Sequence, residues 1–342
     1  MPAWSRWLLA PFHAMAVMTG AKSFRDNPVI GSPALNRRGL HIRRKRLAQW
    51  LAAYRRRRLE ARLDPDDRAA FLRDGYLVIP DFLDPVAFGR MRAEIFACHT
   101  AAREFVDGYT LTRLIPLDGV TLPRLPATAR ALASPRYRGL HDYVGSFRQA
   151  PHLFVQSVFS AVREAPPDVQ SHFHTDTFHP TVKSWLFLTD VAGDAAAFTY
   201  VPGSHRPTRR HLAWERGVSI TAAMQEDRLT GEGSLRIDEG MLARLGYAAP
   251  RKLAVAANTL VIADTSGFHR RGISDGAACR ISIWAYGRGS PFRPWAGLGM
   301  RRRPGRKVRA FWAAQDLLGR LTGRQSGWRW VGERSPATPP AP

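Results

Sequence analysis

The chain has 342 residues, of which 45% are hydrophobic, so it can bury a substantial core as one large domain with extensions or as two ordinary domains. Cys98 and Cys279 lie far apart and exclude both a disulfide framework and a zinc–cysteine site, which indicates a reducing, cytoplasmic compartment. The formal net charge of +23 is concentrated at the two ends: residues 1–60 carry 13 Lys and Arg against 2 Asp and Glu, and residues 288–342 carry 12 against 2. We therefore expect the ends to hold an anionic partner.

Residues 1–60 are predicted to form a basic N-terminal extension. Its first segment, with Trp4, Trp7 and Phe12, is too short and too interrupted to span a bilayer, but its aromatic residues suit a membrane interface. Farther along, "HIRRKRLAQWLAAYRRRRLEARL" predicts a helix on the surface of an anionic membrane. The alternative is a helix packed on the protein body with a solvated arginine face. The predicted apolar stripe consists of Leu47, Trp50, Leu51 and Tyr54.

Residues 61–290 are predicted to form the main domain. Its first part reads as helix, strand, helix: Asp64 or Asp66 caps the first helix, "GYLVIP" is the strand, and Asp84 with Pro85 begins the second helix. From about residue 150, short β-branched and aromatic runs alternate with Gly, Pro and Asp, which predicts a β-sandwich or barrel. We therefore expect an α+β fold with helices covering a β core.

The stretch "SHFHTD" predicts a metal site. In an extended strand, residues two apart share a face, so His172, His174 and Asp176 point the same way, and His179 lies beyond the strand near Pro180. An H-x-D pair supplies two ligands, and one more histidine from elsewhere would complete a facial triad of the type that holds oxygen-activating iron.

A predicted hairpin in "HRRGISDGAACR" indicates a neighbouring anion site. A turn centred on Asp275 and Gly276 would pair Arg271 with Arg280 and place His269 within roughly 7 to 8 Å of Arg280. A guanidinium at that distance from a metal ligand is suited to a bidentate carboxylate contact.

These motifs together resemble the phytanoyl-CoA dioxygenase family of iron(II)- and 2-oxoglutarate-dependent oxygenases. The resemblance spans about residues 64–290 and rests on "FLRDGYLVIPDFLD", "FHTD", "SWLFLTDV", "FTYVPGSH" and the eleven-residue spacing of His269 and Arg280. It implies a double-stranded β-helix, a jelly-roll or cupin-like core, behind N-terminal covering helices.

The resemblance also implies roles for individual residues. His174, Asp176 and His269 would bind Fe(II) and carry catalysis with O2, and Arg280 would bind the distal carboxylate of 2-oxoglutarate. Aspartate at position 176 favours hydroxylation, because halogenating relatives have a small residue there. Two further residues, Trp185 and Gln156, would line the 2-oxoglutarate pocket.

Other polar residues have less definite roles. Three are candidates for substrate contact, namely His179, Arg113 and Arg271. His172 is expected to support the ligands, and His205 in "PGSH" to be a structural turn residue.

Residues 291–342 are predicted to form a basic, aromatic C-terminal extension with a disordered Pro-rich end, "SPATPPAP". Interleaved arginines and aromatic residues also suit single-stranded nucleic acid, but no recognisable nucleic-acid-binding motif accompanies them, so this partner is disfavoured. The sequence does not indicate an oligomeric state.

The predicted function is a dioxygenase that hydroxylates an acidic or lipid-linked substrate at the cytoplasmic face of the inner membrane. Residues 19–41, followed by this oxygenase domain, are similar to bacterial enzymes that hydroxylate the sugar Kdo of the lipopolysaccharide inner core. Two alternatives stay open: a hydroxylase of an acyl-CoA or small metabolite, and a non-catalytic β-helix protein that binds membrane or nucleic acid.

Overall fold

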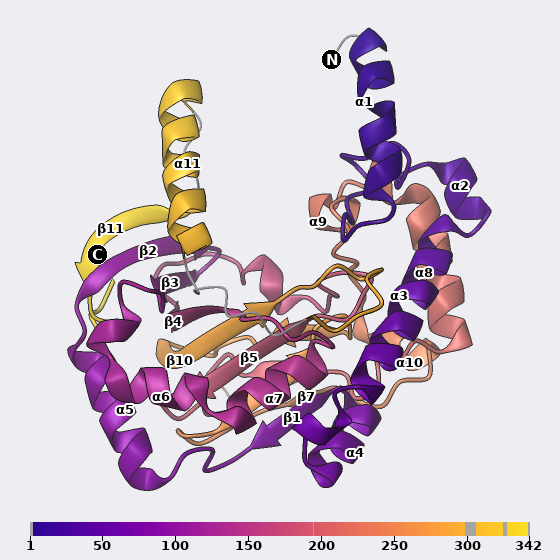
Figure 1. The fold of residues 1–342 in the computed structure, drawn as a ribbon. Coiled ribbons are helices and arrows are strands. Elements are labelled where there is room, and N and C mark those ends of the chain that lie inside the picture. The colour runs from indigo at the N-terminus through magenta and orange to yellow at the C-terminus, as the bar shows by residue number, and fades with distance from the viewer. Residues whose placement is uncertain (1–2, 194, 298–305, 324–326, 341–342) are drawn as a thin grey trace.

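The computed structural model describes residues 3–193, 195–297, 306–323 and 327–340, with no side-chain description for residues 3–9 and 306–307 (Figure 1). Its helices are α1 Ala3–Ala16, α2 Pro33–Arg37, α3 Leu40–Arg57, α4 Pro65–Asp74, α5 Pro85–Ala97, α6 Pro126–Ala133, α7 Pro135–Val144, α8 Arg209–Thr221, α9 Arg228–Gly231, α10 Glu239–Arg244 and α11 Arg306–Thr322. In the described part of the chain, no helix is both long and apolar enough to cross a membrane.

The strands form two antiparallel sheets. The large sheet has the order β1-β8-β5-β10-β4-β3-β2-β11, and the small sheet has the order β7-β6-β9. The large sheet contains β1 Tyr76–Ile79, β2 Thr100–Asp107, β3 Thr110–Pro116, β4 His152–Ser160, β5 Val182–Phe187, β8 Leu260–Asp264, β10 Ala278–Gly287 and β11 Arg329–Arg334. The small sheet contains β6 Phe198–Tyr200, β7 Arg251–Lys252 and β9 His269–Arg271. The predicted α+β class with a jelly-roll core is confirmed.

Side-chain alternation along the strands gives the large sheet two different apolar faces. One face, which includes Ile281 and Ile283 of β10, packs with residues of α5, α6 and α7 in the main core. The other face carries Trp185 and packs against the small sheet, where Phe198 is its partner. The space between the two sheets is therefore where side chains from β5, β6, β9 and β10 can meet.

The predicted elements at the start of the domain are confirmed. The Asp64 side chain accepts a hydrogen bond from the backbone N–H of Asp66 and caps α4, and Asp84 caps α5 just before Pro85. Gly75 ends α4 with a φ of 86°, a conformation that favours glycine, and β1 follows at once. These local signals depend on neighbouring residues only, which is why the sequence predicts them well.

The predicted hairpin between His269 and Arg280 is wrong. Strand β9 pairs with β6 in the small sheet, where Arg271 lies opposite Phe198, and β10 pairs with β4 and β5 in the large sheet, where Arg280 lies opposite Val158. An Asp-Gly motif indicates only the local geometry of a turn. Here the chain crosses from the small sheet to the large one between β9 and β10, and each strand pairs with partners that are distant in sequence.

Helix α3 lies along the protein body with only some of its basic side chains in solvent, among them Arg43 and Arg57. Arg44, Lys45 and Arg55 are buried, whereas Trp50 is 64% exposed and stacks on the exposed Tyr54. The buried arginines donate to backbone carbonyls of other segments, including Ser146 and Arg293 for Arg55. Residues 17–60 therefore pack against the domain, and Leu47, Trp50 and Tyr54 of the predicted stripe remain on the outside.

A buried charged cluster joins α3 to α8. The Glu215 carboxylate lies 2.6 Å from Lys45 Nζ and 2.8 Å from His41 Nε2, and all three side chains are nearly inaccessible. Burial alone would raise the pKa of Glu215, but Lys45 and the hydrogen bonds from His211 and His41 hold it well below its usual range. A charged carboxylate is thus the buried partner of Lys45.

We expect Glu215→Gln to lower the free energy of unfolding by about 3 to 5 kcal/mol, because it leaves the Lys45 ammonium buried without its counter-ion. The matched control is Glu226→Gln at an exposed position, with an expected change below about 0.5 kcal/mol. Chemical denaturation of the two variants measures the difference. Equal stabilities would show that this cluster does not hold the N-terminal segment to the domain.

Candidate metal centre

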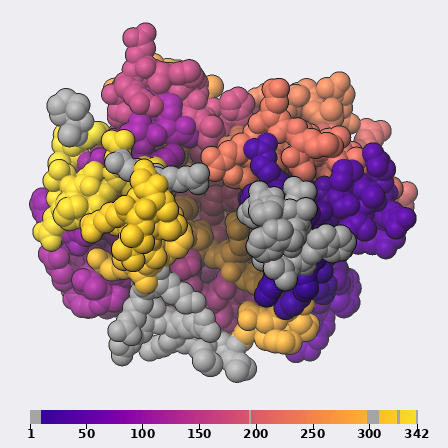
Figure 2. Space-filling model, turned by 90° about the horizontal axis from the view of Figure 1, so that it is seen from above, coloured from indigo at the N-terminus to yellow at the C-terminus, as the bar shows by residue number. Residues whose placement is uncertain are grey.

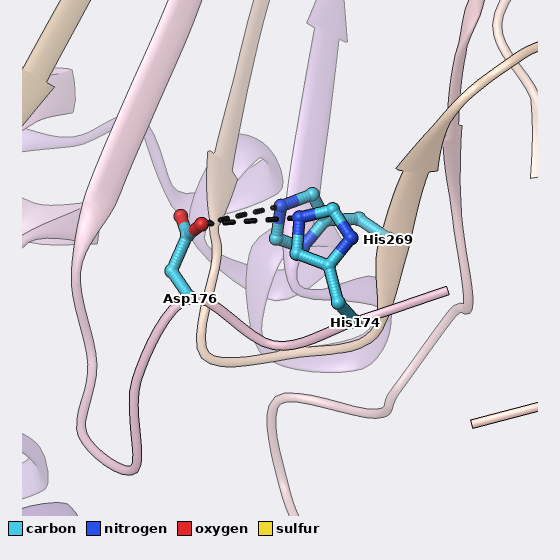
Figure 3. A group of neighbouring side chains, drawn as sticks. All are labelled: His174, Asp176 and His269. Carbon is cyan, nitrogen blue, oxygen red and sulfur yellow. Dashed lines mark ion pairs between the residues drawn. The ribbon is translucent and has the colours of Figure 1, made fainter. Parts of the chain in front are cut away.

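Two backbone hydrogen bonds bring the predicted histidines together. The N–H of His174 donates to the carbonyl of His269, and the N–H of His269 donates to the carbonyl of His174, each at 3.0 Å. The Asp176 N–H donates to the carbonyl of Thr265 at 2.9 Å and extends this contact by two residues. Figure 3 shows the three side chains of His174, Asp176 and His269 converging from the two adjacent segments.

The two imidazoles present the same nitrogen to the centre. The Nδ1 of His174 bonds the carbonyl of His172 at 2.8 Å, and the Nδ1 of His269 bonds the carbonyl of Gly267 at 2.9 Å. Because a carbonyl only accepts, Nδ1 carries the proton in each ring and Nε2 is left as a metal ligand. The two Nε2 atoms lie 4.0 and 3.8 Å from Asp176 Oδ1.

The electrostatics suit metal binding. Burial lowers the pKa of both His174 and His269, so each ring is neutral, the form that coordinates a cation. Burial would raise the pKa of Asp176, but the charge and the hydrogen bond of Lys183 hold it below its usual range as a carboxylate. Among the described residues, the buried Nε2 of His174 has no hydrogen-bond partner.

These residues fit the iron implied by the family resemblance. Their ligand atoms all lie within 4.8 Å of one another, and they are the group with metal-binding geometry found among the described residues. Two neutral imidazoles and one carboxylate on one side of a cation form a facial triad, which leaves adjacent positions open for other ligands.

Arg280, Trp185 and Gln156 lie on the face of the large sheet that looks toward the small sheet. Their strand partners show this: Ser282 lies opposite Gln156 and Trp284 lies opposite Trp185, and both partners are an even number of residues from Arg280 along β10. Arg280 is 8% exposed, donates to the carbonyl of Ala196 at 2.8 Å, and burial lowers its pKa to about 9.

Trp185 connects this face to the metal ligands. Its ring centroid lies 4.5 Å from that of Phe198, and the Phe198 centroid lies 5.6 Å from that of His269. The large sheet therefore supplies an aromatic wall and a buried guanidinium, and the small sheet supplies His269, without the hairpin that the sequence predicted.

Arg271 has a counter-ion within the chain. Its Nη1 lies 2.8 Å from Oδ2 of Asp168, a carboxylate that is 2% exposed. Asp168 is therefore the partner of Arg271, and it also caps a short 3-10 helix at Val169–Ser171. Asp168 was missed because only its capping role has a local signal, and the structure gives Arg271 a protein partner in place of a free guanidinium.

Arg113 lies away from the metal centre. It is 1% exposed, sits opposite Ser157 on β4, and donates to Glu104 and to the carbonyls of Ser335 and Thr338. Residues 335 and 336 of the Pro-rich end, which the sequence predicts to be disordered, accept hydrogen bonds from Arg113 and Ser157. Residues 341–342 lie outside the described part of the chain.

The remaining histidines have different environments. His172 is exposed and contributes its carbonyl to His174, as a supporting residue would. His205 is buried and packs 5.5 Å from Phe71 between ring centroids. His179 is 1% exposed, and burial lowers its pKa to about 3. Gly20 lies against this ring, because a Cβ added at Gly20 would lie 3.4 Å from the His179 Nε2. The N-terminal segment therefore covers His179.

Two lysines beside Asp176 were missed by the sequence prediction. Lys183 Nζ lies 2.7 and 2.9 Å from the two carboxylate oxygens, and Lys22 Nζ donates to the Asp176 carbonyl at 2.7 Å. Burial and the nearby Arg288 lower the pKa of Lys22 to about 8. Lys183 lies two residues before Trp185 in the same strand, so the alternation of side chains could have placed it on the inner face. No local signal in the sequence places Lys22 there.

The sequence model of the phytanoyl-CoA dioxygenase (PhyH) family matches residues 71–218. The matched part of the chain includes the metal-ligand candidates His174 and Asp176. The resemblance seen in the sequence is confirmed, and with the triad it makes the chain a non-haem iron- and 2-oxoglutarate-dependent enzyme. No curated protein sequence matches the chain.

Several solved structures are similar to the domain. They include the α-ketoglutarate-dependent epimerase SnoN from nogalamycin biosynthesis (19% identity, TM-score 0.44, covering 65% of this chain and 81% of that one). HygX from Streptomyces hygroscopicus with nickel, 2-oxoglutarate and hygromycin B bound is also similar (19%, 0.39, 66% and 88%). A third is EctD from S. alaskensis with bound iron (15%, 0.38, 66% and 76%).

We expect His174→Ala to lower the affinity of the dioxygenase domain for Fe(II) at least about 100-fold, because it removes one of three protein ligands. His172→Ala is the matched control: it keeps the backbone carbonyl that orients His174 and should bind metal as the wild type does. Anaerobic titration calorimetry with Fe(II) measures both. Equal loss in the two variants would contradict the assignment of ligands.

Proposed function

We propose that the protein hydroxylates a C–H bond of an acidic, lipid-linked sugar, with the Kdo residue of the lipopolysaccharide inner core as the best candidate. The supporting observation is the complete triad with its aspartate at position 176, which lies beside the cations Lys22 and Lys183. When bound, iron(II) with 2-oxoglutarate and O2 supplies the oxidation that side chains cannot perform, yielding the hydroxylated product, succinate and carbon dioxide.

In this proposal each residue has a positioning role. His174, Asp176 and His269 hold the iron, and Arg280 pairs with the far carboxylate of 2-oxoglutarate, for which its buried guanidinium is suited. Trp185 and Gln156 line the same inner face and keep water from the co-substrate. Among the described residues, the Arg280 guanidinium donates to the carbonyl of Ala196 and to no carboxylate, which supports its use for a bound one.

The experiment that tests the function compares the mass of cellular glycolipids with and without the protein, and then of purified Kdo-containing glycolipid treated with enzyme, Fe(II), 2-oxoglutarate and O2. We expect a gain of one oxygen atom, about 16 Da, in the Kdo fragment together with one succinate per product.

Arg280→Gln should raise the KM for 2-oxoglutarate at least about 10-fold, because a desolvated charge pair is lost.

The alternatives give different results in the same assay. Oxygen incorporation into an acyl-CoA or another small metabolite, with none in the glycolipid, would replace the proposed substrate. Metal-loaded protein that neither binds nor turns over 2-oxoglutarate would leave the non-catalytic binding protein as the remaining interpretation.

We also propose that the enzyme works at the cytoplasmic face of the inner membrane. Helices α1 and α11 rise from the same side of the molecule (Figure 1). Their exposed apolar side chains support a membrane contact, because monomeric proteins rarely expose such groups together. These include Phe12 and Met15 of α1 and Phe311, Leu317, Leu318 and Leu321 of α11, of which Leu321 is 76% exposed. Trp4, Trp7 and the arginines at 301–303 lie outside the residues whose side chains are described.

The basic ends would add attraction to anionic lipid, at roughly 1 kcal/mol for each cation near the surface. We expect the protein to bind phosphatidylglycerol-containing vesicles in a salt-sensitive way and the double variant Leu317→Asp with Leu321→Asp to bind at least about fivefold more weakly. The control carries Leu72→Asp and Val86→Asp, exposed on α4 and α5. Vesicle sedimentation measures all three. Unchanged binding of the α11 variant would exclude this helix as the contact.

A further inference from the structure

We propose that the N-terminal segment around Lys22 forms one wall of the active site, and that Lys22 and Arg288 create an anion subsite for the carboxylate of the substrate. The inference rests on the proposed function and deepens it, because it names the chemical group that the enzyme recognises. It also gives an active-site role to residues that the sequence placed in the N-terminal extension.

The first observation is the position of Lys22. Its ammonium donates to the backbone carbonyl of Asp176 at 2.7 Å, although the two residues are 154 positions apart in sequence. Lys183 reaches the carboxylate of the same aspartate. A metal ligand of the domain is therefore in direct contact with the segment that precedes it.

The second observation is that this segment is held firmly in place. The buried guanidinium of Arg44 on α3 donates to the carbonyls of Val17, Thr19 and Ala21, at 2.9, 3.1 and 2.7 Å. The same guanidinium lies 4.3 Å from the ring centre of Phe178, next to His179. Three hydrogen bonds to one arginine order the backbone just before Lys22, so the ammonium is positioned before a substrate arrives.

The third observation is a cavity at this place. It has a volume of about 490 Å³ and is lined by His13, Gly20, Ala21, Lys22, Ser23, Asp26, Asn27, Glu232 and Arg288. Figure 2 shows the face that carries α1 and α11, which is hollowed between the yellow C-terminal helix and the indigo N-terminal segment. The cavity is within the size range of small-molecule sites.

The charges of this cavity are not balanced. Glu232 is paired with the Arg228 guanidinium at 2.6 Å, whereas Asp26 accepts from the neutral hydroxyl of Ser23 at 2.8 Å and keeps its charge. Arg288 is exposed, and among the described residues its guanidinium donates to no protein acceptor. With Glu232 paired to Arg228, the cations Lys22 and Arg288 outweigh Asp26 in this cavity, and a substrate carboxylate would neutralise the remaining positive charge.

This subsite differs from the one expected for 2-oxoglutarate. Arg280 lies near the beginning of β10, and Arg288 follows directly after its end at Gly287. Eight residues of strand correspond to about 26 Å at about 3.3 Å per residue, too far for both arginines to bind one small dicarboxylate. Two separate anions are therefore expected, with 2-oxoglutarate at Arg280 and the acidic substrate at Lys22 and Arg288.

The test compares an acidic sugar with its uncharged counterpart. Enzyme loaded with Ni(II) and 2-oxoglutarate is titrated with the methyl glycoside of Kdo and with the methyl ester of that glycoside. We expect the acid to bind at least about 10-fold more tightly than the ester, and Lys22→Gln or Arg288→Gln to reduce the affinity for the acid at least about fivefold with little effect on the ester. Lys22→Arg should restore the preference, and Arg90→Gln, exposed on α5, is the control.

Equal affinity for acid and ester, no binding of the acid, or unchanged binding by both variants would overturn the subsite. Arg288 is exposed, so its variant remains informative if Lys22→Gln does not fold. The glycolipid assay separates the two proposals. Absence of the 16 Da product with wild-type enzyme removes the proposed function, whereas product formation with an unchanged KM for glycolipid in both variants removes the anion subsite alone.

Discussion

His174 and His269 exchange two backbone hydrogen bonds, and the metal centre depends on this contact. Because the backbones are joined, the two rings lie with their centroids 4.5 Å apart, and each ring is oriented by a carbonyl two residues earlier in its own segment. Asp176 is then placed by its bond to Thr265. The ligands are thus positioned mainly by main-chain hydrogen bonds, which constrain geometry more firmly than flexible side chains can.

The space between the two sheets gives this centre its surroundings. Trp185 and Phe198 fill the side next to His269, and Arg280 reaches from the large sheet to the carbonyl of Ala196 near the small one. Burial keeps the histidines neutral, and Lys183 keeps Asp176 charged against the effect of burial. Desolvation and the Lys183 charge together therefore set the protonation states that a divalent cation requires.

The N-terminal segment shows how positive charge is used inside this protein. Three cationic residues of α3 are buried: Lys45 pairs with Glu215, and Arg44 and Arg55 donate to backbone carbonyls. The aromatic residues Trp50 and Tyr54, which a hydrophobic pattern assigns to one functional face, stay at the surface. Arginine can serve as a buried donor because its planar guanidinium donates to several carbonyls at once. The periodicity of hydrophobic residues alone does not predict such burial.

The sequence by itself determined the elements whose signals are local: the capped helices α4 and α5, strand β1, and the H-x-D pair at His174 and Asp176. The resemblance to the dioxygenase family added His269, which the tertiary structure brings to that pair. Only the tertiary structure decided which sheet each strand joins, that Arg271 is paired with Asp168, and that Lys22 contacts Asp176. These contacts join residues 69 to 154 positions apart in sequence. The free energy that selects them comes from burial and pairing in the folded chain, which no short stretch of sequence contains.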